Sequence, residues 1–214
     1  MVGSMKSDAK VIVFEGLDAS GKHTQAQRLY EYMIQHGRDP LLLSFPVYEN
    51  QTGKMITEYL NGRMPKADPQ FISMIYTMNR VEAFTTVGDL SKYDVLILDR
   101  YATSNYLYQM SKLPSNEWRT YIDESETSEY EYSKLPSPTQ VFYLDLFPDN
   151  SRQLLLSRGR PLDKLEEDIR IQQKARAAAM FAAGYLQWTI IDCNGNPIRA
   201  EDDIFADIIK ELNQ

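Results

Sequence analysis

The sequence predicts a single α/β domain in which helices flank a five-stranded parallel sheet. Two observations lead to this prediction. Short apolar runs alternate along the 214-residue chain with stretches whose apolar residues recur at helical spacing. The runs are continuously apolar and include β-branched residues, which is typical of parallel strands covered by helices on both faces.

Five runs are expected to form the strands, and the stretches between them the helices. The strands are expected over residues 10–16, 40–46, 93–100, 140–146 and 186–192. Helices are expected from residue 22 to a stop at Gly37, over 51–61 and 68–88, from 151 onward, through an alanine-rich stretch to about 183, and over 200–212.

The bulk composition fits one ordered domain. Apolar residues make up 43% of the chain, enough for a substantial core. The formal net charge of −7 argues against a protein that coats a nucleic acid polymer, because such proteins present a clustered positive surface. No apolar run approaches the ~20 residues of a membrane-spanning helix, so no membrane partner is expected.

The ends and the acidic segment of the chain add three expectations. Cys193 is the single cysteine and cannot form an internal disulfide, which suits a reducing cytoplasm. The start "MVGSMKSDAK" lacks an apolar signal core, so residues 1–9 are expected to be a disordered or vector-derived leader before one domain over 10–214. The segment "DESETSEYEYS" (123–133) is expected to be a solvated acidic helix or excursion rather than a binding site.

The stretch "GLDASGK", from Gly16 to Lys22, matches the G-x-x-x-x-G-K pattern of a phosphate-binding loop. Its context fits, because a predicted strand precedes it and a predicted helix follows. In such loops glycines let several N–H groups point inward, and the helix N-terminus adds partial positive charge. Lys22 is expected to reach the β- and γ-phosphates of a bound nucleotide.

His23 departs from the pattern, which usually has Ser or Thr after the lysine. A hydroxyl there helps to hold Mg²⁺, a cation that prefers oxygen ligands. Thr24 cannot take over the same position, because one residue along a helix turns the side chain by roughly 100°. His23 is then either a tolerated variant or a sign of altered metal handling. Phosphate oxygens, water and a carboxylate such as Glu15 or Asp99 are the alternative metal ligands.

Two charged residues, Asp99 and Arg100, end the third predicted strand. Ligands of open α/β sheets gather at the carboxyl ends of the strands. The two residues are either a structural ion pair, or a carboxylate near the metal and an arginine that holds an anionic acceptor.

An aromatic residue and an arginine lie four positions apart in the third predicted helix. Tyr76 and Arg80 share one helical face and could stack on and hydrogen-bond a nucleobase. The alternative is core packing with a surface charge. Phe45–Pro46 ends the second predicted strand.

Together these motifs resemble the thymidylate kinases, which are nucleoside monophosphate kinases of the P-loop class. The resemblance covers nearly the whole chain, in order. It takes in "FEGLDASGKHTQ", "SFPVYENQTGKMITEYLNG", "YTMNRVEAF", "DRYATSNYLYQ", "YLDL", "SRGRPLDKLEED" and "WTIID". The Asp-Arg-Tyr run at 99–101, followed by Ser104 and Tyr108–Gln109, is its most specific element.

The resemblance implies a P-loop NTPase fold with a mobile lid over about 157–166. It also implies transfer of the ATP γ-phosphoryl group to dTMP, giving dTDP, with Mg²⁺ as cofactor and a homodimer as the assembly. The alternatives are a kinase for another deoxynucleoside monophosphate or for a deoxynucleoside, and a non-catalytic P-loop protein that only binds nucleotides.

The expected site residues form four groups: the resemblance assigns the first three by motif position, and the metal ligands are the carboxylates named above for a loop with His23. The catalytic residues would be Lys22, Asp18, Arg100 and the lid residues Arg158 and Arg160, with Lys164 nearby in the lid. The ATP phosphates would contact Gly16, Ala19, Ser20, Gly21, Lys22, His23 and Thr24. The dTMP would contact Asp18, Phe45, Pro46, Tyr48, Tyr76, Arg80, Arg100, Tyr101, Ser104, Asn105, Tyr108 and Gln109. The metal would be held through water by Glu15 and Asp99. Some relatives place an arginine just after the Phe-Pro pair, where this chain has Val47 and Tyr48, so phosphate binding would depend more on Arg100.

Overall fold

The computed structural model describes residues 3, 5–64, 67–157 and 168–213. Five parallel strands form one sheet in the order β2-β3-β1-β4-β5. The strands are β1 Lys10–Gly16, β2 Pro40–Ser44, β3 Val95–Asp99, β4 Gln140–Asp145 and β5 Thr189–Asp192. The predicted five-stranded parallel sheet is therefore confirmed.

The sheet is covered on both faces, which explains why its central strands are continuously apolar. In β1, Val11 and Val13 pack into one core cluster, and Ile12 and Phe14 pack into another on the opposite face. This alternation follows from the two-residue period of a strand. Every second residue therefore faces a different helical layer, and both sets must be apolar.

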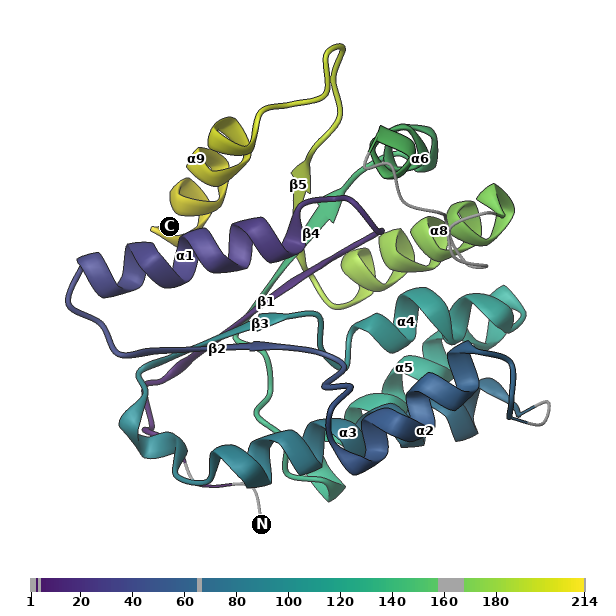
Figure 1. Cartoon of the computed structure of the whole chain (residues 1–214), viewed down its shortest axis with the longest axis horizontal. Coiled ribbons are helices and arrows are strands. Elements are labelled where there is room, and N and C mark those ends of the chain that lie inside the picture. The colour runs from purple at the N-terminus through teal and green to yellow at the C-terminus, as the bar shows by residue number, and fades with distance from the viewer. Residues whose placement is uncertain (1–2, 4, 65–66, 158–167, 214) are drawn as a thin grey trace.

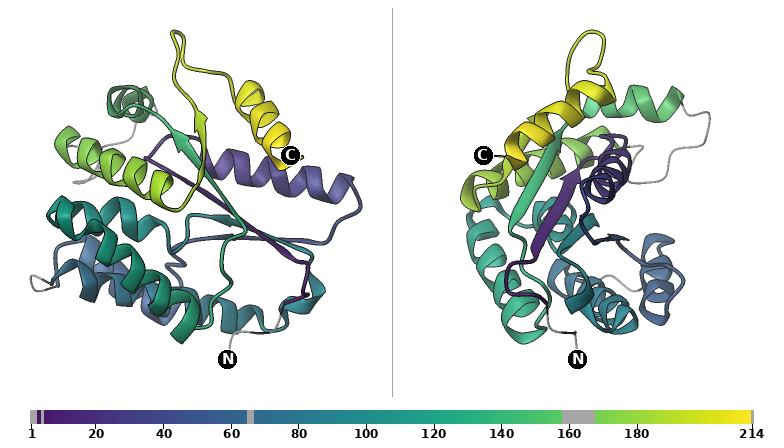
Figure 2. Two further views of the ribbon diagram at one scale, coloured as in Figure 1. Left: turned by 180° about the vertical axis from the view of Figure 1, so that it is seen from behind. Right: turned by 90° about the vertical axis from the view of Figure 1, so that its left-hand side faces the viewer.

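Helices form a layer on each side of the sheet (Figures 1 and 2). On one side α1 Lys22–Gln35 and α9 Glu201–Leu212 bury Ala26, Leu29, Ile204 and Ile208. On the other side lie α3 Pro69–Val87, α4 Ser104–Tyr108, α5 Trp118–Glu126 and α8 Ile169–Tyr185. The helix α2 Gln51–Leu60 packs on α3, and α6 Pro148–Ser157 packs near α8.

Capping residues set where α3 and α2 begin. The Asp68 carboxylate accepts a hydrogen bond from the Phe71 N–H, and Pro69 occupies the first position of α3. The Asn50 side chain accepts from the Gly53 N–H at the start of α2. Such caps satisfy backbone donors that have no partner within the helix.

The structure corrects one expectation drawn from the sequence. The segment 123–133 is not simply solvated, because it continues α5 into a π-helical turn, Thr127–Tyr132, that buries Glu129. Within the predicted leader over 1–9, Met5 packs against the core and Ala9 is buried. The expected lid, including Arg158, Arg160 and Lys164, lies almost wholly outside the described residues. Within the described ranges, no helix has the length and apolar character needed to cross a bilayer.

Candidate active site

The loop between β1 and α1 has the backbone geometry of a phosphate cradle. Gly16, Ala19 and Gly21 have φ values of 152°, 61° and 88°. A side chain at Gly16 would lie 2.6 Å from the Leu144 carbonyl oxygen, so only glycine fits there. Gly21 is the N-cap of α1, and the loop therefore ends at a helix N-terminus, where backbone N–H groups favour an anion.

Lys22 is folded back into this loop. Its ammonium donates a hydrogen bond to the Leu17 carbonyl oxygen at 2.7 Å, and only 6% of the residue is exposed. Burial and the nearby Arg100 charge lower the pKa of Lys22 to about 8. The lysine thus lies inside the loop, close to its point of deprotonation.

His23 lies against the carboxylate of Asp99. Its Nδ1 is 3.1 Å from Asp99 Oδ2, which also accepts a hydrogen bond from Ser44 Oγ at 3.3 Å. The His23 side chain is 75% exposed, whereas that of Asp99 is 12% exposed. Thr24 is half-buried in the first turn of α1. The imidazole therefore lies next to Asp99, the last residue of β3.

Glu15 lies beneath the loop and is fully buried. Its Oε2 accepts hydrogen bonds from Thr103 Oγ1 at 2.9 Å and Ser104 Oγ at 2.6 Å, and its Oε1 accepts from the Gly16 N–H at 3.2 Å. Burial raises the pKa of this carboxyl. Since Oε2 already holds the start of α4 and Oε1 is bound to the Gly16 N–H, Glu15 fits a structural role better than a metal ligand. Asp99 is the better candidate of the two.

Arg100 does not pair with Asp99, its neighbour in sequence. The backbone of Arg100 has a φ of 63°, which turns its side chain towards Asp18 and Tyr108. Its Nη2 forms an ion pair with Asp18, and its Nη1 donates to the Tyr108 hydroxyl at 3.4 Å. The alternative of a structural Asp99–Arg100 pair is therefore wrong. Arg100 instead presents a positive charge, 21% exposed, beside the phosphate loop.

A cavity of about 440 Å³ opens next to Arg100. Both arginines singled out in the sequence, Arg80 and Arg100, line it, and so does every other residue that the resemblance assigned to the acceptor. These residues are Asp18, Phe45, Pro46, Tyr48, Tyr76, Arg80, Arg100, Tyr101, Ser104, Asn105, Tyr108 and Gln109. The Asn105 side-chain nitrogen is buried and makes no hydrogen bond within the described part of the chain, so it can serve a ligand.

Side chains of α3 fix the chain on one wall of this cavity. The Asn79 amide accepts from the Val47 N–H at 2.9 Å and donates to the Val47 carbonyl oxygen at 2.8 Å. One turn further, Glu82 accepts hydrogen bonds from the Gln51 and Thr52 N–H groups. The loop that carries Phe45, Pro46 and Tyr48 is therefore held to the same rigid helix as Tyr76 and Arg80.

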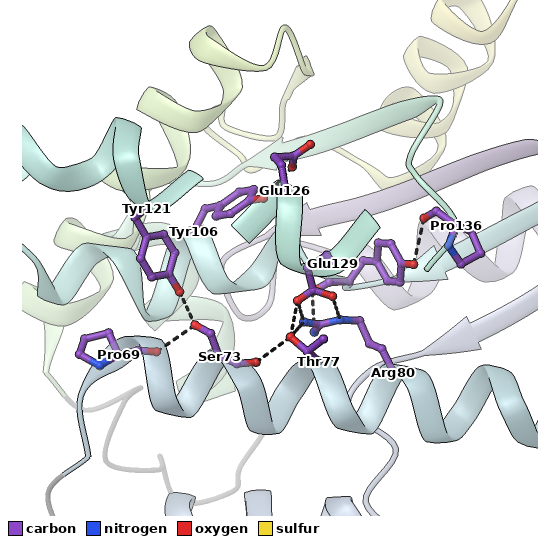
Figure 3. A network of polar contacts seen from close by, with 10 residues as sticks. Pro69, Ser73, Thr77, Arg80, Tyr106, Tyr121, Glu126, Glu129 and Pro136 are labelled. Carbon is purple, nitrogen blue, oxygen red and sulfur yellow. Dashed lines mark hydrogen bonds and ion pairs between the residues drawn. The ribbon is translucent and has the colours of Figure 1, made fainter. Parts of the chain in front are cut away.

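Arg80 is a buried charge with a buried partner, not a surface charge. Arg80 is 2% exposed and Glu129 is 1% exposed, and they form a bidentate ion pair (Figure 3). The alternative of core packing with an exposed arginine is therefore wrong. Tyr76 is half-buried on the same face of α3 and also lines the cavity.

Several lining residues were not found from the sequence. They are Tyr59 and Leu60 at the end of α2, Ser111 and Lys112 after α4, and Ile171 and Lys174 in α8. Lys112 donates hydrogen bonds of 2.7 Å to both the Tyr59 hydroxyl and the Gln109 amide oxygen. No motif spacing marks these residues, because only the packing of α2, α4 and α8 brings them to the cavity.

Comparison with known proteins identifies the family. A sequence model of the thymidylate kinases, described as "Thymidylate kinase", matches residues 14–204. The chain belongs to the thymidylate kinase family. The resemblance that the motifs carry is thus confirmed.

Individual thymidylate kinases match over almost their whole length. The one from Schizosaccharomyces pombe is 31% identical, over 98% of this chain and 96% of its own. The one from Plasmodium falciparum is 29% identical, over 98% of this chain and 92% of its own. The solved structure of the Candida albicans thymidylate kinase superimposes with a TM-score of 0.73 at 22% identity, covering 96% of this chain and 92% of that one, and so supports the fold.

Proposed function

We propose that this chain transfers the γ-phosphoryl group of ATP to dTMP, giving dTDP. Membership of the thymidylate kinase family supports the reaction. The single observation that carries the assignment in the structure is the cavity, which combines an arginine near the phosphate loop with Tyr76 and Arg80 deeper inside. A nucleoside monophosphate has the matching order of groups, an anion followed by a sugar and a flat base.

On the donor side, Lys22 and the loop N–H groups hold the β- and γ-phosphates of ATP. The backbone angles at Gly16, Ala19 and Gly21 support this role, as does the ammonium of Lys22 inside the loop. Phosphoryl transfer needs little covalent chemistry from the protein, so positioning and charge neutralisation provide most of the catalysis.

Mg²⁺ fits this site through Asp99 together with phosphate oxygens and water. Mg²⁺ usually keeps several waters and takes one or two carboxylates besides the substrate phosphates. Asp99 has a carboxylate at the strand end, and His23 contacts one of its oxygens. When bound, the ion would neutralise charge on the β- and γ-phosphates.

On the acceptor side, Arg100 binds the dTMP phosphate and the aromatic residues bind its base. Asp18 and Tyr108, which contact Arg100, lie near the sugar. Tyr76 stacks on thymine with Phe45, and Arg80 donates a hydrogen bond to the base. Arg158 and Arg160 complete the charge neutralisation from the lid.

The assembly is a homodimer in the cytoplasm. An exposed apolar face of α3, formed by Phe71, Met74 and Met78, supports an interface, because these side chains are 47%, 61% and 53% exposed. Light scattering after size exclusion tests this point. Wild-type protein is expected to have the mass of a dimer, and Met74→Glu is expected to shift it to a monomer. Wild-type protein with the mass of a monomer would contradict the dimer.

An acceptor panel tests the proposed reaction. ADP and dTDP formation are measured with ATP and Mg²⁺ against dTMP, dUMP, dCMP, dGMP, dAMP and thymidine. The highest kcat/KM is expected for dTMP. Nucleotide binding without any dTDP would support a non-catalytic P-loop protein, and a faster second acceptor would reassign the substrate.

A further inference from the structure

The Arg80 guanidinium is fixed along one edge and available along the other. Its Nε donates to Glu129 Oε2 at 3.0 Å, and its Nη2 donates to Glu129 Oε1. Among the described residues, its Nη1 has only a long contact of 3.5 Å, to the Tyr101 carbonyl oxygen. Since Arg80 lines the cavity, Nη1 is the group left to donate to a ligand.

Glu129 lies in the π-helical turn Thr127–Tyr132 that continues α5, and it is the buried residue of that turn. Such turns often mark functional positions within helices. Thr77, one turn before Arg80 on α3, also donates to Glu129 Oε1 at 2.7 Å (Figure 3). Two consecutive turns of α3 thus hold one buried carboxylate, which leaves Glu129 little freedom to move.

An arginine without an acidic partner in this cavity would be poorly suited to recognise a base. A guanidinium that carries a free charge is drawn to phosphate, the strongest acceptor that a nucleotide offers. The ion pair with Glu129 neutralises the charge of Arg80 and fixes the plane of its guanidinium group. Binding of the phosphate is then left to Arg100, whose own partner Asp18 is 27% exposed.

We propose that Glu129 is a positioning residue for acceptor recognition: it holds Arg80 so that Nη1 meets a carbonyl oxygen of the base. Because Nη1 can only donate, this arrangement favours a pyrimidine with a carbonyl at position 4 over one with an amino group. The inference rests on the proposed function, in which the cavity binds a nucleoside monophosphate.

Glu129→Gln tests this role, since it keeps the shape of the side chain and removes its charge. The KM for dTMP is expected to rise at least about 10-fold, because a charge-assisted pair is lost. The preference for dTMP over dCMP in kcat/KM is expected to fall by a similar factor. KM for ATP and kcat at saturating dTMP are expected to change little, which a general loss of structure would not produce. Glu129→Asp, which restores the charge, is expected to recover part of the preference.

Glu126→Gln is the matched control. Glu126 lies three residues earlier, is partly buried and accepts a hydrogen bond from the Tyr106 hydroxyl at 2.7 Å, but it does not line the cavity. It is expected to leave KM and base preference unchanged. A folded Glu129→Gln variant with unchanged KM and preference, or a Glu126→Gln variant with the same defect, would overturn the proposal.

Two further measurements keep the test decisive. If Glu129→Gln does not fold, Thr77→Val removes the hydroxyl that donates to Glu129 and accepts from Arg80 Nη2 at 3.4 Å, and a smaller change in the same direction is expected. Calorimetric binding of dTMP and dCMP separates this proposal from the proposed function. If wild-type protein binds dTMP in preference to dCMP without turnover, the proposed reaction is wrong, but the ratio of the two Kd values still tests the role of Glu129. The same ratio in wild type and Glu129→Gln would overturn that role.

Discussion

The two ends of the acceptor cavity hold their arginines in different ways. At the deep end, Arg80 and Glu129 are 2% and 1% exposed and are fixed by a helix and a π-helical turn. At the end near the phosphate loop, Arg100 and Asp18 are 21% and 27% exposed, and both lie at the carboxyl ends of strands. One charge is locked in place, and the other remains accessible.

Under the proposed function, this difference matches what each end would recognise: a base at Arg80 and a phosphate at Arg100. A base keeps the same charge throughout the reaction, so a buried arginine whose charge is already paired can donate to the base without moving. A phosphate that accepts a second phosphoryl group changes its charge, so the arginine beside it must respond to that change. The comparison suggests that specificity and chemistry are divided between the two ends.

Arg100→Ala is expected to have the largest effect. Removal of the guanidinium takes away the phosphate contact and leaves the Asp18 carboxylate to repel the acceptor, so kcat/KM for dTMP should fall by about 10³-fold. Thymidine, which has no phosphate, should bind the variant as it binds wild type in a competition assay. Equal losses for dTMP and thymidine would mean that Arg100 does not act at the phosphate end.

Arg80→Met is expected to have the next largest effect, on stability. Removal of one partner of a buried pair costs about 3–5 kcal/mol, which corresponds to a fall in Tm of roughly 6–20 °C for a chain of this size. The double variant Arg80→Met with Glu129→Leu should recover most of this loss without recovering dTMP preference. Arg100→Met, which leaves a partner that is only partly buried, should lower Tm by less than about 4 °C. Similar Tm losses for the two single variants would break the comparison.

ATP affinity is expected to depend on pH through Lys22. Since the pKa of Lys22 in the free protein is about 8, half of the ammonium is deprotonated near pH 8. Bound phosphates favour the protonated form. The affinity should therefore hold below pH 8 and fall above it by up to about tenfold per pH unit. Calorimetry measures this, with Lys22→Arg as the control, because arginine stays charged and should give a flat profile. A flat profile in wild type would contradict the assignment.

His23→Thr is expected to have the smallest effect. A hydroxyl in place of the imidazole provides an oxygen ligand, so the variant should be as active as wild type or more active and should need less Mg²⁺. A titration of activity against Mg²⁺ measures this. A loss of more than about tenfold, or about 1.4 kcal/mol, would give the imidazole an active role.

The strands and the phosphate loop could be predicted from the sequence because their signals are local, whereas most residues of the cavity were assigned by the resemblance to the thymidylate kinases. An apolar run before "GLDASGK" fixes β1 and the loop, and helical spacing places Tyr76 and Arg80 on one face of α3. The partner of Arg80 could not be predicted this way. Glu129 lies in an acidic segment that is typical of a solvated helix, and its burial follows only from packing against a helix 49 residues earlier.

The remaining differences have the same origin. The backbone of Arg100, with its φ of 63°, turns the side chain away from Asp99 and towards Asp18. The neighbouring residues in the sequence do not indicate which carboxylate the arginine pairs with. Similarly, Lys112 and Lys174 reach the cavity only through the packing of α4 and α8. Tertiary contacts therefore decided the pairing of charges, while local patterns decided the elements.

A crystal structure of the dTMP complex would test the division between the two ends most directly. Arg80 Nη1 is expected to lie about 2.7–3.2 Å from a carbonyl oxygen of thymine, with the Glu129 pair intact and Arg100 on the phosphate. A phosphate bound by Arg80, or a base held away from α3 with Glu129 released from Arg80, would contradict it.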